Sequence, residues 1–359
     1  MNKIYFVIGT KAQFIKCKPV INYIADKCNV VILLTNQHKD FLDKFMIEID
    51  PNIKIINFLQ NNSSLDTIFK NIKWFVSSIF KIITNKTFKP EVNSLIINHG
   101  DTLSALLGVV FALKHKVKKL HLEAGLRSGK FFKPFPEEII RKLVSLNSDY
   151  LVADGSESLQ NLNNYFKTKN LYTTTINTAY DNLDIADINT FRTTNEIIIL
   201  MHRSENIFSK KNLKKFVEYL IQLQKYHSDS KFIWIMHPST ESQLLKYNLN
   251  VKVQDTIEIY GLMEHKKFIS LLKNSLLFIT DSLSAEFESF VLRKKTVVWR
   301  NSFVNRYKLD SFLYITKKSS FDSSILETSS LINADIDEKF SVVNKPSFEF
   351  YEIIKKIGY

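Results

Sequence analysis

The sequence predicts a two-domain α/β protein in which each domain is a Rossmann-like, doubly wound parallel sheet. Short apolar runs rich in β-branched residues alternate with longer segments of helical periodicity. This alternation restarts near residue 190, after a polar stretch, and 359 residues suit two domains of ordinary size. Two such domains would face each other across a cleft at the carboxyl ends of their strands, where ligands of open α/β sheets bind.

The first half contains strand and helix patterns in strict alternation. Apolar runs that predict buried parallel strands lie at 3–9, 29–35, 93–100, 117–125 and 148–155. Helical spacing of apolar residues appears at 13–27 and 101–116. The stretch 74–86 is interrupted by Lys81 and predicts a buried helix, and no run of about 18 apolar residues indicates a membrane span.

The second half repeats the same alternation after the polar segment 181–195, which suits an interdomain connection. Strands are expected at 195–203, 231–238, 255–261, 276–282 and 295–300, and helices at 214–227, 265–275 and 284–294. A last helical pattern at 347–359 closes the chain. We therefore expect an N-terminal Rossmann-like domain at 1–185, a C-terminal Rossmann-like domain at 186–340, and a helix within 341–359 that packs back on the first domain.

Composition narrows the class of protein. A hydrophobic fraction of 45% and a mean hydropathy of -0.09 indicate a globular protein with a substantial core. Cys17 and Cys28 form no metal-ligand pattern and suggest structural thiols in a reducing compartment. The short N-terminal apolar run does not suit a secretory signal. A cytoplasmic protein is expected.

The net charge of +13 leaves several partners open, among them nucleic acid, an anionic membrane surface and phosphorylated small molecules. The basic residues are spread along the chain, with one dense cluster at 114–119. No zinc-finger spacing or aromatic RNA-binding motif accompanies them. We expect a lysine-rich composition without a nucleic-acid partner, and contact with a membrane surface stays open.

The segment 121–143 gathers acids and bases around a Gly turn and two prolines. Glu123 follows an apolar run, and Glu137 and Glu138 follow Pro136. These residues are either a solvated loop and helix start or a site that moves protons. Asp101 also ends an expected strand, although the simpler interpretation is that it caps the next helix.

Other expected strand ends also carry polar groups. The turn after the first strand and the helix that follows bring Lys11, Lys16 and backbone N–H groups that suit an anion, but they lack the spacing of a nucleotide-binding P-loop. In the second half, His202 and His237 follow strands, and Ser282 begins a helix. Together these groups favour an enzyme with its site in a cleft. No nucleophile elbow, HExxH or GxGxxG motif is present, so neither metal nor nicotinamide chemistry is predicted.

The chain resembles the non-hydrolysing UDP-N-acetylglucosamine 2-epimerases. The matching motifs, in the same order, are GTKAQFIKCKP, TNQH, HGDT, HLEAGLRSGKFFKPFPEEIIRKL, NTAYDNL, HRSENI and TDSLSAEFE. The resemblance implies a glycosyltransferase-B-like pair of Rossmann domains, a homodimer, and no redox cofactor. It also implies a reaction that eliminates UDP across C1–C2 of the sugar, forms a glycal, and adds UDP back after protonation of the opposite face.

The resemblance also assigns roles to individual residues. Acid/base candidates are Asp101, Glu123 and Glu137, and His202 is expected near the diphosphate or C2. The substrate-binding set is Lys11, Lys16, Arg127, Arg141, Ser282, Ser284 and Glu288, with Glu288 at the ribose hydroxyls. A regulatory second sugar-nucleotide site would include Gln37 and His38.

Several positions depart from the family pattern. Lys11 stands where the family has Arg. Its compact ammonium group therefore binds an anion more weakly than the two-pronged guanidinium of Arg would. Leu283 and Ser284 replace two glycines near the diphosphate, and Ile140 and Ser204 replace an Asn and an Arg. These changes fit a different sugar, a different nucleotide or a different reaction on the same scaffold.

We therefore favour epimerisation at C2 of a UDP-N-acetyl amino sugar, in bacterial-type surface polysaccharide synthesis. The main alternative is a glycosyltransferase of related fold that passes a sugar to a polysaccharide or lipid-linked acceptor. A third interpretation is a nucleotide-sugar-binding regulator without turnover. The hydrolysing epimerase subtype is disfavoured because 121–143 resembles the non-hydrolysing pattern.

Overall fold

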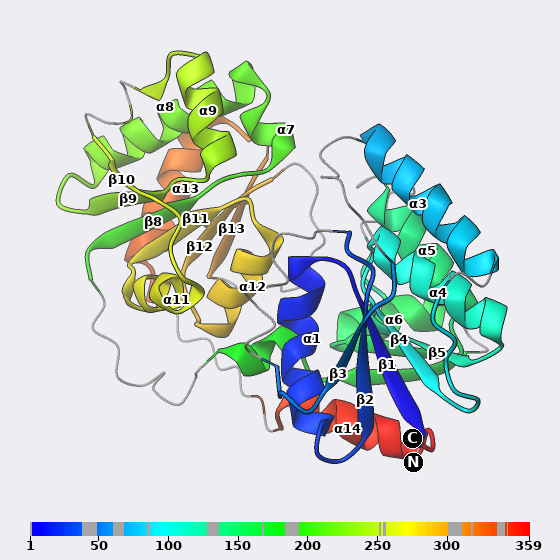
Figure 1. The fold of residues 1–359 in the computed structure, drawn as a ribbon. Coiled ribbons are helices and arrows are strands. Elements are labelled where there is room, and N and C mark those ends of the chain that lie inside the picture. Colours follow the sequence, from blue (N-terminus) through cyan, green and yellow to red (C-terminus); the bar gives the residue numbers. More distant parts are fainter. Residues whose placement is uncertain are drawn as a thin grey trace. The chain divides into compact units, whose positions relative to one another are not determined.

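The computed structural model describes residues 2–37, 49–59, 68–84, 87–127, 136–166, 169–183, 194–250, 253, 256–300, 311–316, 319–335, 342 and 344–359. The chain divides into two compact units. The first is Met1–Asn182 with Ser341–Tyr359, and the second is Leu183–Phe340. Each unit is a parallel sheet with helices on its faces, so the predicted pair of doubly wound α/β folds is confirmed (Figure 1).

The described residues of the first unit form a seven-stranded sheet in the order β3-β2-β1-β4-β5-β6-β7. The strands are β1 Lys3–Ile8, β2 Asn29–Leu34, β3 Lys54–Asn57, β4 Leu95–His99, β5 Lys118–Ala124, β6 Tyr150–Asp154 and β7 Asn170–Thr174. The strand order reverses between β1 and β4. In such sheets the ligand crevice lies outside the carboxyl ends of the strands at the reversal.

Helices cover both faces of this sheet. They are α1 Lys11–Ile24, α3 Ile68–Ile83, α4 Leu103–His115, α5 Glu137–Asn147, α6 Ser156–Tyr165, the 3₁₀ helix η2 Thr178–Asn182 and α14 Pro346–Lys356. Alternate residues of β1 point to opposite faces. Phe6 packs in the cluster that includes Phe350 of α14, whereas Tyr5 packs in the cluster that includes Trp74 of α3 and Phe111 of α4.

Helix α3 corrects one prediction. The stretch 74–86 was expected to be a buried helix, and Trp74 is indeed buried. Ile72, Val76, Phe80 and Ile83, however, are between 53% and 61% exposed. These four residues recur at intervals of three or four, so they form one apolar row along the outer side of the helix. The helix therefore has a core-facing side and an exposed apolar side.

The described part of the second unit has a six-stranded sheet in the order β10-β9-β8-β11-β12-β13. Its strands are β8 Glu196–Leu200, β9 Lys231–Ile235, β10 Glu258–Tyr260, β11 Leu277–Thr280, β12 Thr296–Trp299 and β13 Phe312–Ile315. Its helices are α7 Ser204–Ile207, α8 Lys210–Tyr226, α9 Pro238–Lys246, α11 His265–Asn274, α12 Leu283–Val291 and α13 Phe321–Asn333. The order reverses between β8 and β11, so this unit presents a second crevice at its strand ends.

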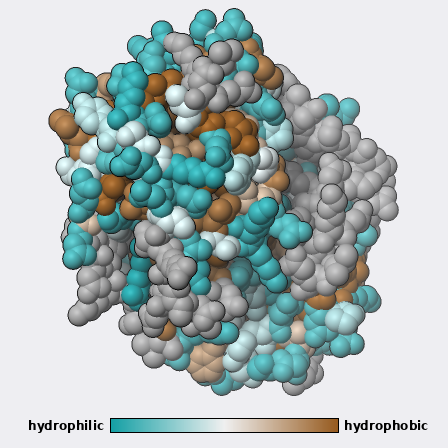
Figure 2. Space-filling model, turned by 90° about the vertical axis from the view of Figure 1, so that its left-hand side faces the viewer, coloured by the Kyte–Doolittle hydropathy of each residue, from teal (hydrophilic) through white to brown (hydrophobic). Residues whose placement is uncertain are grey.

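The core of the second unit is largely aliphatic, with a group of aromatic rings packed inside it. The ring of Phe216 on α8 makes edge contacts with Trp234 of β9 and Trp299 of β12, at centroid distances of 5.5 Å and 5.0 Å. Outside the core, the face drawn in Figure 2 is largely hydrophilic with scattered hydrophobic patches. Within the described ranges, no helix combines the length and apolarity needed to cross a bilayer.

Candidate active site

The turn after β1 begins the candidate site of the first unit. Thr10 caps α1, and Gln13 completes a capping box. Gln13 Oε1 accepts hydrogen bonds from Gly9 N at 3.0 Å and Thr10 N at 3.3 Å, while Gln13 Nε2 donates to His99 O at 2.9 Å. Two of the backbone N–H groups at this turn, which was expected to suit an anion, therefore already donate to Gln13.

Glu123 is the centre of the site at this sheet edge. It is 4% exposed, and its φ of 62° is unusual for a residue with a side chain. The pairing register between β5 and β6 shifts at this position, so the strand bulges where the carboxylate emerges. Strained backbone of this kind costs roughly 1–3 kcal/mol and is concentrated at functional sites.

Two side chains donate hydrogen bonds to the Glu123 carboxylate, and a third lies close to it. Lys16 Nζ of α1 donates to Oε1 at 2.5 Å, and Asn177 Nδ2 donates to the same oxygen at 3.0 Å. His99 Nε2 of β4 lies 3.3 Å from Oε2. Burial lowers the pKa of His99 to about 4, and this effect outweighs the opposite influence of Glu123. His99 is therefore neutral near pH 7, and Lys16 supplies the positive charge beside Glu123.

Asp101 belongs to a second cluster of charges, together with α5. Arg141 donates to Asp101 Oδ2 and, at 2.8 Å, to Glu138 Oε2. Arg127 Nε lies 3.8 Å from Glu138 Oε1. Thr102, not Asp101, caps α4 through its side chain. The interpretation of Asp101 as a simple helix cap is therefore wrong, and its carboxylate instead faces a buried guanidinium.

Glu137 is the first residue of α5, where the partial positive charge of a helix N-terminus favours a carboxylate. Its Oε2 is buried and has no hydrogen-bond partner among the described residues. A buried acceptor without a partner costs about 1–3 kcal/mol. Glu137 thus has an oxygen available to a ligand or a proton.

His121 fixes the turn that carries Asp101. Its Nε2 is 2.9 Å from Gly100 O, and its Nδ1 is 2.9 Å from Ser145 Oγ of α5. Burial lowers the pKa of His121 to about 3, so the ring is neutral. This buried imidazole links the turn after β4 to α5 and so positions Asp101 relative to Arg141.

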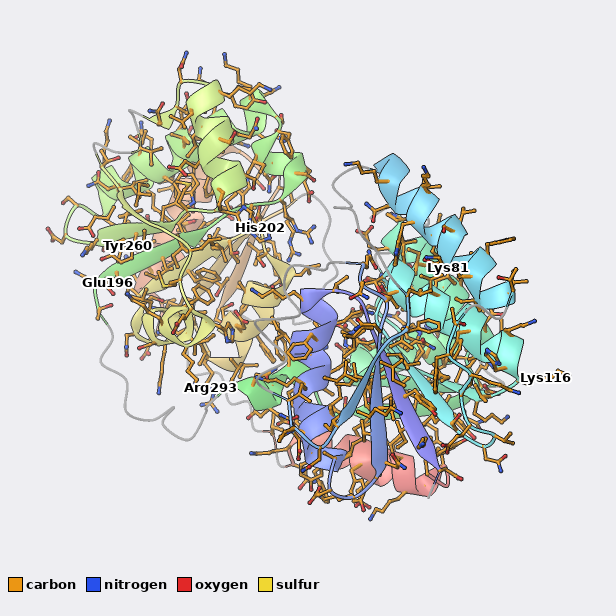
Figure 3. The ribbon with its side chains drawn as sticks, in the orientation of Figure 1. Lys81, Lys116, Glu196, His202, Tyr260 and Arg293 are labelled. Atoms are coloured by element: carbon orange, nitrogen blue, oxygen red, sulfur yellow. The ribbon has the colours of Figure 1, made fainter. Side chains whose placement is uncertain are left out.

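In the second unit, Asp281 organises the turn after β8. Asp281 is fully buried, and it accepts hydrogen bonds from His202 N at 3.0 Å, Arg203 N at 2.9 Å and Asn206 Nδ2 at 2.9 Å. His202, labelled in Figure 3, lies just beyond the end of β8. Its ring is 5.7 Å from that of His237, and burial lowers the pKa of His202. Two imidazoles therefore meet at the carboxyl edge of this sheet.

The N-terminus of α12 is near this edge. Ser282 Oγ accepts from Ala285 N at 3.4 Å as the helix cap and lies 3.1 Å from Ser284 Oγ. Glu288 accepts from His265 Nε2 at 2.8 Å. All three predicted binding residues of this helix therefore already have protein partners, and Ser284 is exposed.

A buried ion pair lies behind α12. Arg300, at the end of β12, donates to Glu286 Oε2, and Tyr314 OH donates to Glu286 Oε1 at 3.1 Å. Arg300 and Glu286 are each 2% exposed. The pair joins α12 to β12 and β13, so it holds the helix whose first turn carries Ser282.

The remaining predicted residues are less tightly grouped. Lys11 is exposed at the start of α1. Gln37 Oε1 accepts from Ser104 N at 3.2 Å and Ser104 Oγ at 2.7 Å, so it contacts the first turn of α4. His38 lies outside the described residues.

Sequence reasoning missed several groups that contact the predicted ones, namely His99, Asp154, Asn177, Asp281 and the Glu286–Arg300 pair. Most of them lie inside the motifs that were quoted for other residues. The sequence signal that could have identified these residues is their position in the same motifs, because residues of one motif lie close together at the site.

The sequence profile of one family, described as UDP-N-acetylglucosamine 2-epimerase, matches residues 24–308. The chain belongs to this family. The UDP-N-acetylglucosamine 2-epimerase of Methanocaldococcus jannaschii is 30% identical over 321 residues, which cover 84% of each chain. The enzyme of the same name from Yersinia pestis is 26% identical over 332 residues, covering 86% of this chain and 85% of that one. The expected family, with this chain as a divergent member, is confirmed.

Solved structures of 2-epimerases agree with the fold. The crystal structure of the M. jannaschii enzyme in complex with UDP-GlcNAc and UDP aligns with a TM-score of 0.77 at 25% identity, covering 99% of this chain and 100% of that one. Phytolacca americana UGT2 aligns with a TM-score of 0.61 at 10% identity, which is a likeness of fold alone. The glycosyltransferase-B-like fold is thus confirmed, and the chain is a 2-epimerase-like isomerase.

Proposed function

We propose that this 2-epimerase family member epimerises C2 of a UDP-N-acetyl amino sugar of the UDP-GlcNAc and UDP-ManNAc type. The family match over residues 24–308 supports the reaction. The observation that carries the proposal is the buried carboxylate of Glu123, which is held at the sheet edge by Lys16 and Asn177. Removal of a proton from carbon requires a base held in place, and the bulged end of β5 supplies one.

The proposed reaction passes through a glycal. A base takes the C2 proton, the electrons of that C–H bond form a C1–C2 double bond, and the bond from C1 to the UDP oxygen breaks to release UDP. An acid then returns a proton to the opposite face of C2, and a UDP oxygen attacks C1 to restore the glycosidic bond. The starting material and product have the same atoms and oxidation state.

The carboxylates of the first unit fit the two proton transfers. Glu123 is beside the ammonium group of Lys16, which favours its ionised form, so it suits the role of base. Glu137 has a buried oxygen with no partner among the described residues, so it suits proton transfer on the other side of the sugar. Asp101 is paired with Arg141, and we assign it to orienting the substrate or relaying a proton.

Cations and donors of both units suit the negative charge of UDP. We propose that Lys11, with Arg127 and Arg141, holds substrate charge in the first unit. In the second unit, His202, Ser282 and Ser284 would bind the diphosphate, and Glu288 would bind the ribose hydroxyls. Binding of ribose would then require Glu288 to exchange its bond with His265.

We further propose a homodimer in which the apolar row of α3 is covered by a second copy. Four large apolar side chains at least 53% exposed on one helix support this arrangement. Light scattering of the purified protein and of a Phe80→Glu variant checks it. A dimer that becomes a monomer in the variant is expected, and a wild-type monomer would exclude it.

The cellular role is also part of the proposal. A sugar nucleotide epimerised at C2 suits surface polysaccharide synthesis in the cytoplasm, and the two free cysteines fit a reducing compartment. Gln37 and His38 would contribute to a regulatory sugar-nucleotide site. Gln37 contacts the first turn of α4, the helix that begins directly after Asp101 and Thr102.

Proton NMR of the protein with UDP-N-acetylglucosamine in D₂O, without an acceptor, tests the reaction. Loss of the C2 proton signal and growth of manno-configured resonances are expected. Glu123→Gln and Glu137→Gln should abolish exchange, while Glu157→Gln on the exposed side of α6 should not. An unchanged spectrum despite demonstrated binding of the sugar nucleotide would favour a glycosyltransferase, because Leu283 and Ser284 alter the first turn of α12.

A further inference from the structure

Asn177 lies between β7 and η2, and its side chain connects two carboxylates. It is 2% exposed. Its Nδ2 donates to Glu123 Oε1 at 3.0 Å and to Asp154 Oδ2 at 3.0 Å. Its Oδ1 accepts from Ala179 N at 3.0 Å. The amide thus makes three hydrogen bonds inside the first unit, and two of them go to acids at the ends of neighbouring strands β5 and β6.

These partners fix the orientation of the amide. Ionised carboxylates only accept hydrogen bonds, so the NH₂ group must face Glu123 and Asp154 with one hydrogen for each. The carbonyl oxygen must then face Ala179 N, which only donates. A reversed amide would place three oxygens against one another and leave a backbone N–H against an NH₂ group. Asn177 is therefore held in one orientation by its surroundings.

The charged and titratable groups around Glu123 come from several elements. Lys16 of α1 brings a positive charge at 2.5 Å, and the neutral imidazole of His99 lies at 3.3 Å. Burial raises the pKa of the Cys17 thiol of α1, and the nearby charge of Glu123 raises it further. Asp154 is a second carboxylate, and it also accepts from Ser158 Oγ at 2.9 Å. In this arrangement Asn177 separates two negative charges that would otherwise destabilise each other.

The segment that carries Asn177 is tied to the rest of the first unit. Thr178 Oγ1 donates to Lys16 O at 2.6 Å, and Asn182 Nδ2 donates to Ile15 O at 2.6 Å. Glu349 of α14 accepts from Thr175 N and Thr175 Oγ1, each at 2.6 Å. The turn with Asn177 and the helix with Lys16 are therefore joined by hydrogen bonds. Both donors to Glu123 Oε1 are held in the same framework.

From this geometry we infer that Asn177 is a positioning residue for proton transfer, which keeps Glu123 oriented and ionised by sharing its amide with Asp154. The inference deepens the proposed function, since it rests on Glu123 handling the C2 proton. It also gives the motif NTAYDNL, which had no role of its own, a chemical reason. The role is indirect, because Asn177 acts through Glu123 and Asp154.

Asn177→Asp is the sharpest variant because it keeps the shape of the side chain. It removes the two N–H donors and places a third carboxylate within hydrogen-bonding distance of two others. Glu123 should then take up its proton at a higher pH, because a donor to its charged form is lost and a like charge is added. We expect the acidic limb of the kcat profile for C2 exchange to move up by about one pH unit or more, and kcat to fall by about 100-fold.

Asn182→Asp is the matched control. It makes the same chemical change five residues further along the chain, at the end of η2. The hydrogen bond lost there runs from Asn182 Nδ2 to Ile15 O and does not involve a carboxylate. It should lower the melting temperature and leave the acidic limb where it is. If Asn177→Asp behaves in the same way as this control, Asn177 is only structural and the inference is wrong.

A direct titration separates this inference from the proposed function. The protein is labelled with ¹³C at the glutamate carboxyl carbons, and the Glu123 signal is identified by its loss in Glu123→Gln. Asn177→Asp should raise the pH midpoint of that signal, and Asp154→Asn, which removes a neighbouring negative charge, should lower it. A midpoint that neither variant moves would overturn the inference. If the wild type shows no C2 exchange, the proposed function fails, and the titration still decides whether Asn177 controls Glu123.

Discussion

Acid should destabilise the folded state through His121, and the size of this effect can be worked out. The buried ring has its pKa lowered from 6.5 to about 3. Gly100 O can only accept, so Nε2 carries the proton and Nδ1 accepts from the Ser145 hydroxyl. A second proton would place a positive charge on a ring that is fully buried, and this burial is the main cause of the lowered pKa. The folded state therefore binds that proton far less readily than the unfolded chain does.

When the pH falls below 6.5, the unfolded chain takes up a proton at His121, and the folded chain does not until about pH 3. Stability from this group is therefore fully present above pH 6.5 and is lost as the pH falls. Each pH unit below the unfolded pKa costs about 1.4 kcal/mol. From about pH 7.5 to about pH 5, His121 should account for roughly 2 kcal/mol of lost unfolding free energy.

Urea unfolding of the wild type, His121→Asn and Ser145→Ala at both pH values measures this contribution. Other groups titrate in the same range, so the informative quantity is the difference between variants. In His121→Asn the drop in unfolding free energy should be smaller than in the wild type by roughly 2 kcal/mol. Ser145→Ala loses one of the same hydrogen bonds but keeps the imidazole, so it should retain the full drop. An equal drop in His121→Asn and wild type would refute the reasoning.

Three further variants test packing and charge. Gly125→Ala should cost about 3 kcal/mol or more in urea unfolding, because φ is 91° and the new Cβ would lie 2.2 Å from Ser158 O. A loss below about 1 kcal/mol would contradict that clash. Arg300→Met should cost about 3–5 kcal/mol by leaving Glu286 unpaired, and adding Glu286→Gln should recover part of it. Asp281→Asn should weaken UDP binding about tenfold in calorimetry, because Asn cannot accept at both ends from the turn after β8. An unchanged affinity for UDP would show that the turn after β8 does not contribute to UDP binding.

The buried central strands could be predicted from the sequence, whereas the edge strand β3 was not predicted. The central strands are near-continuous apolar runs, so their ends, and with them Asp101 and Glu123, could be placed from the sequence. β3 is an edge strand in which Lys54, Ile55 and Asn57 are exposed, and its polar residues interrupt the apolar run. Burial on both faces produces the continuous apolar run that identifies a central strand, and β3 is not buried in this way.

The contacts of the site could not be predicted in the same way. Glu123 meets Lys16 across 107 residues and Asn177 across 54, and no periodicity reports such distances. Asp101 and Thr102 are both good helix caps, so only the backbone geometry decides that Thr102 takes the role. Gln13 could equally have left the N–H groups of the turn after β1 to a ligand. Pairing choices among adjacent polar groups depend on tertiary structure.

The last helix of the chain belongs to the first unit, and this has a consequence for synthesis on the ribosome. Phe350 and Ile354 of α14 complete the core cluster that Phe6 and Phe14 begin. The nascent first unit must therefore wait, with that apolar surface uncovered, until the whole second unit has been translated. A fragment that ends at Asn182 should aggregate when expressed alone, and adding a peptide of residues 341–359 should restore its solubility.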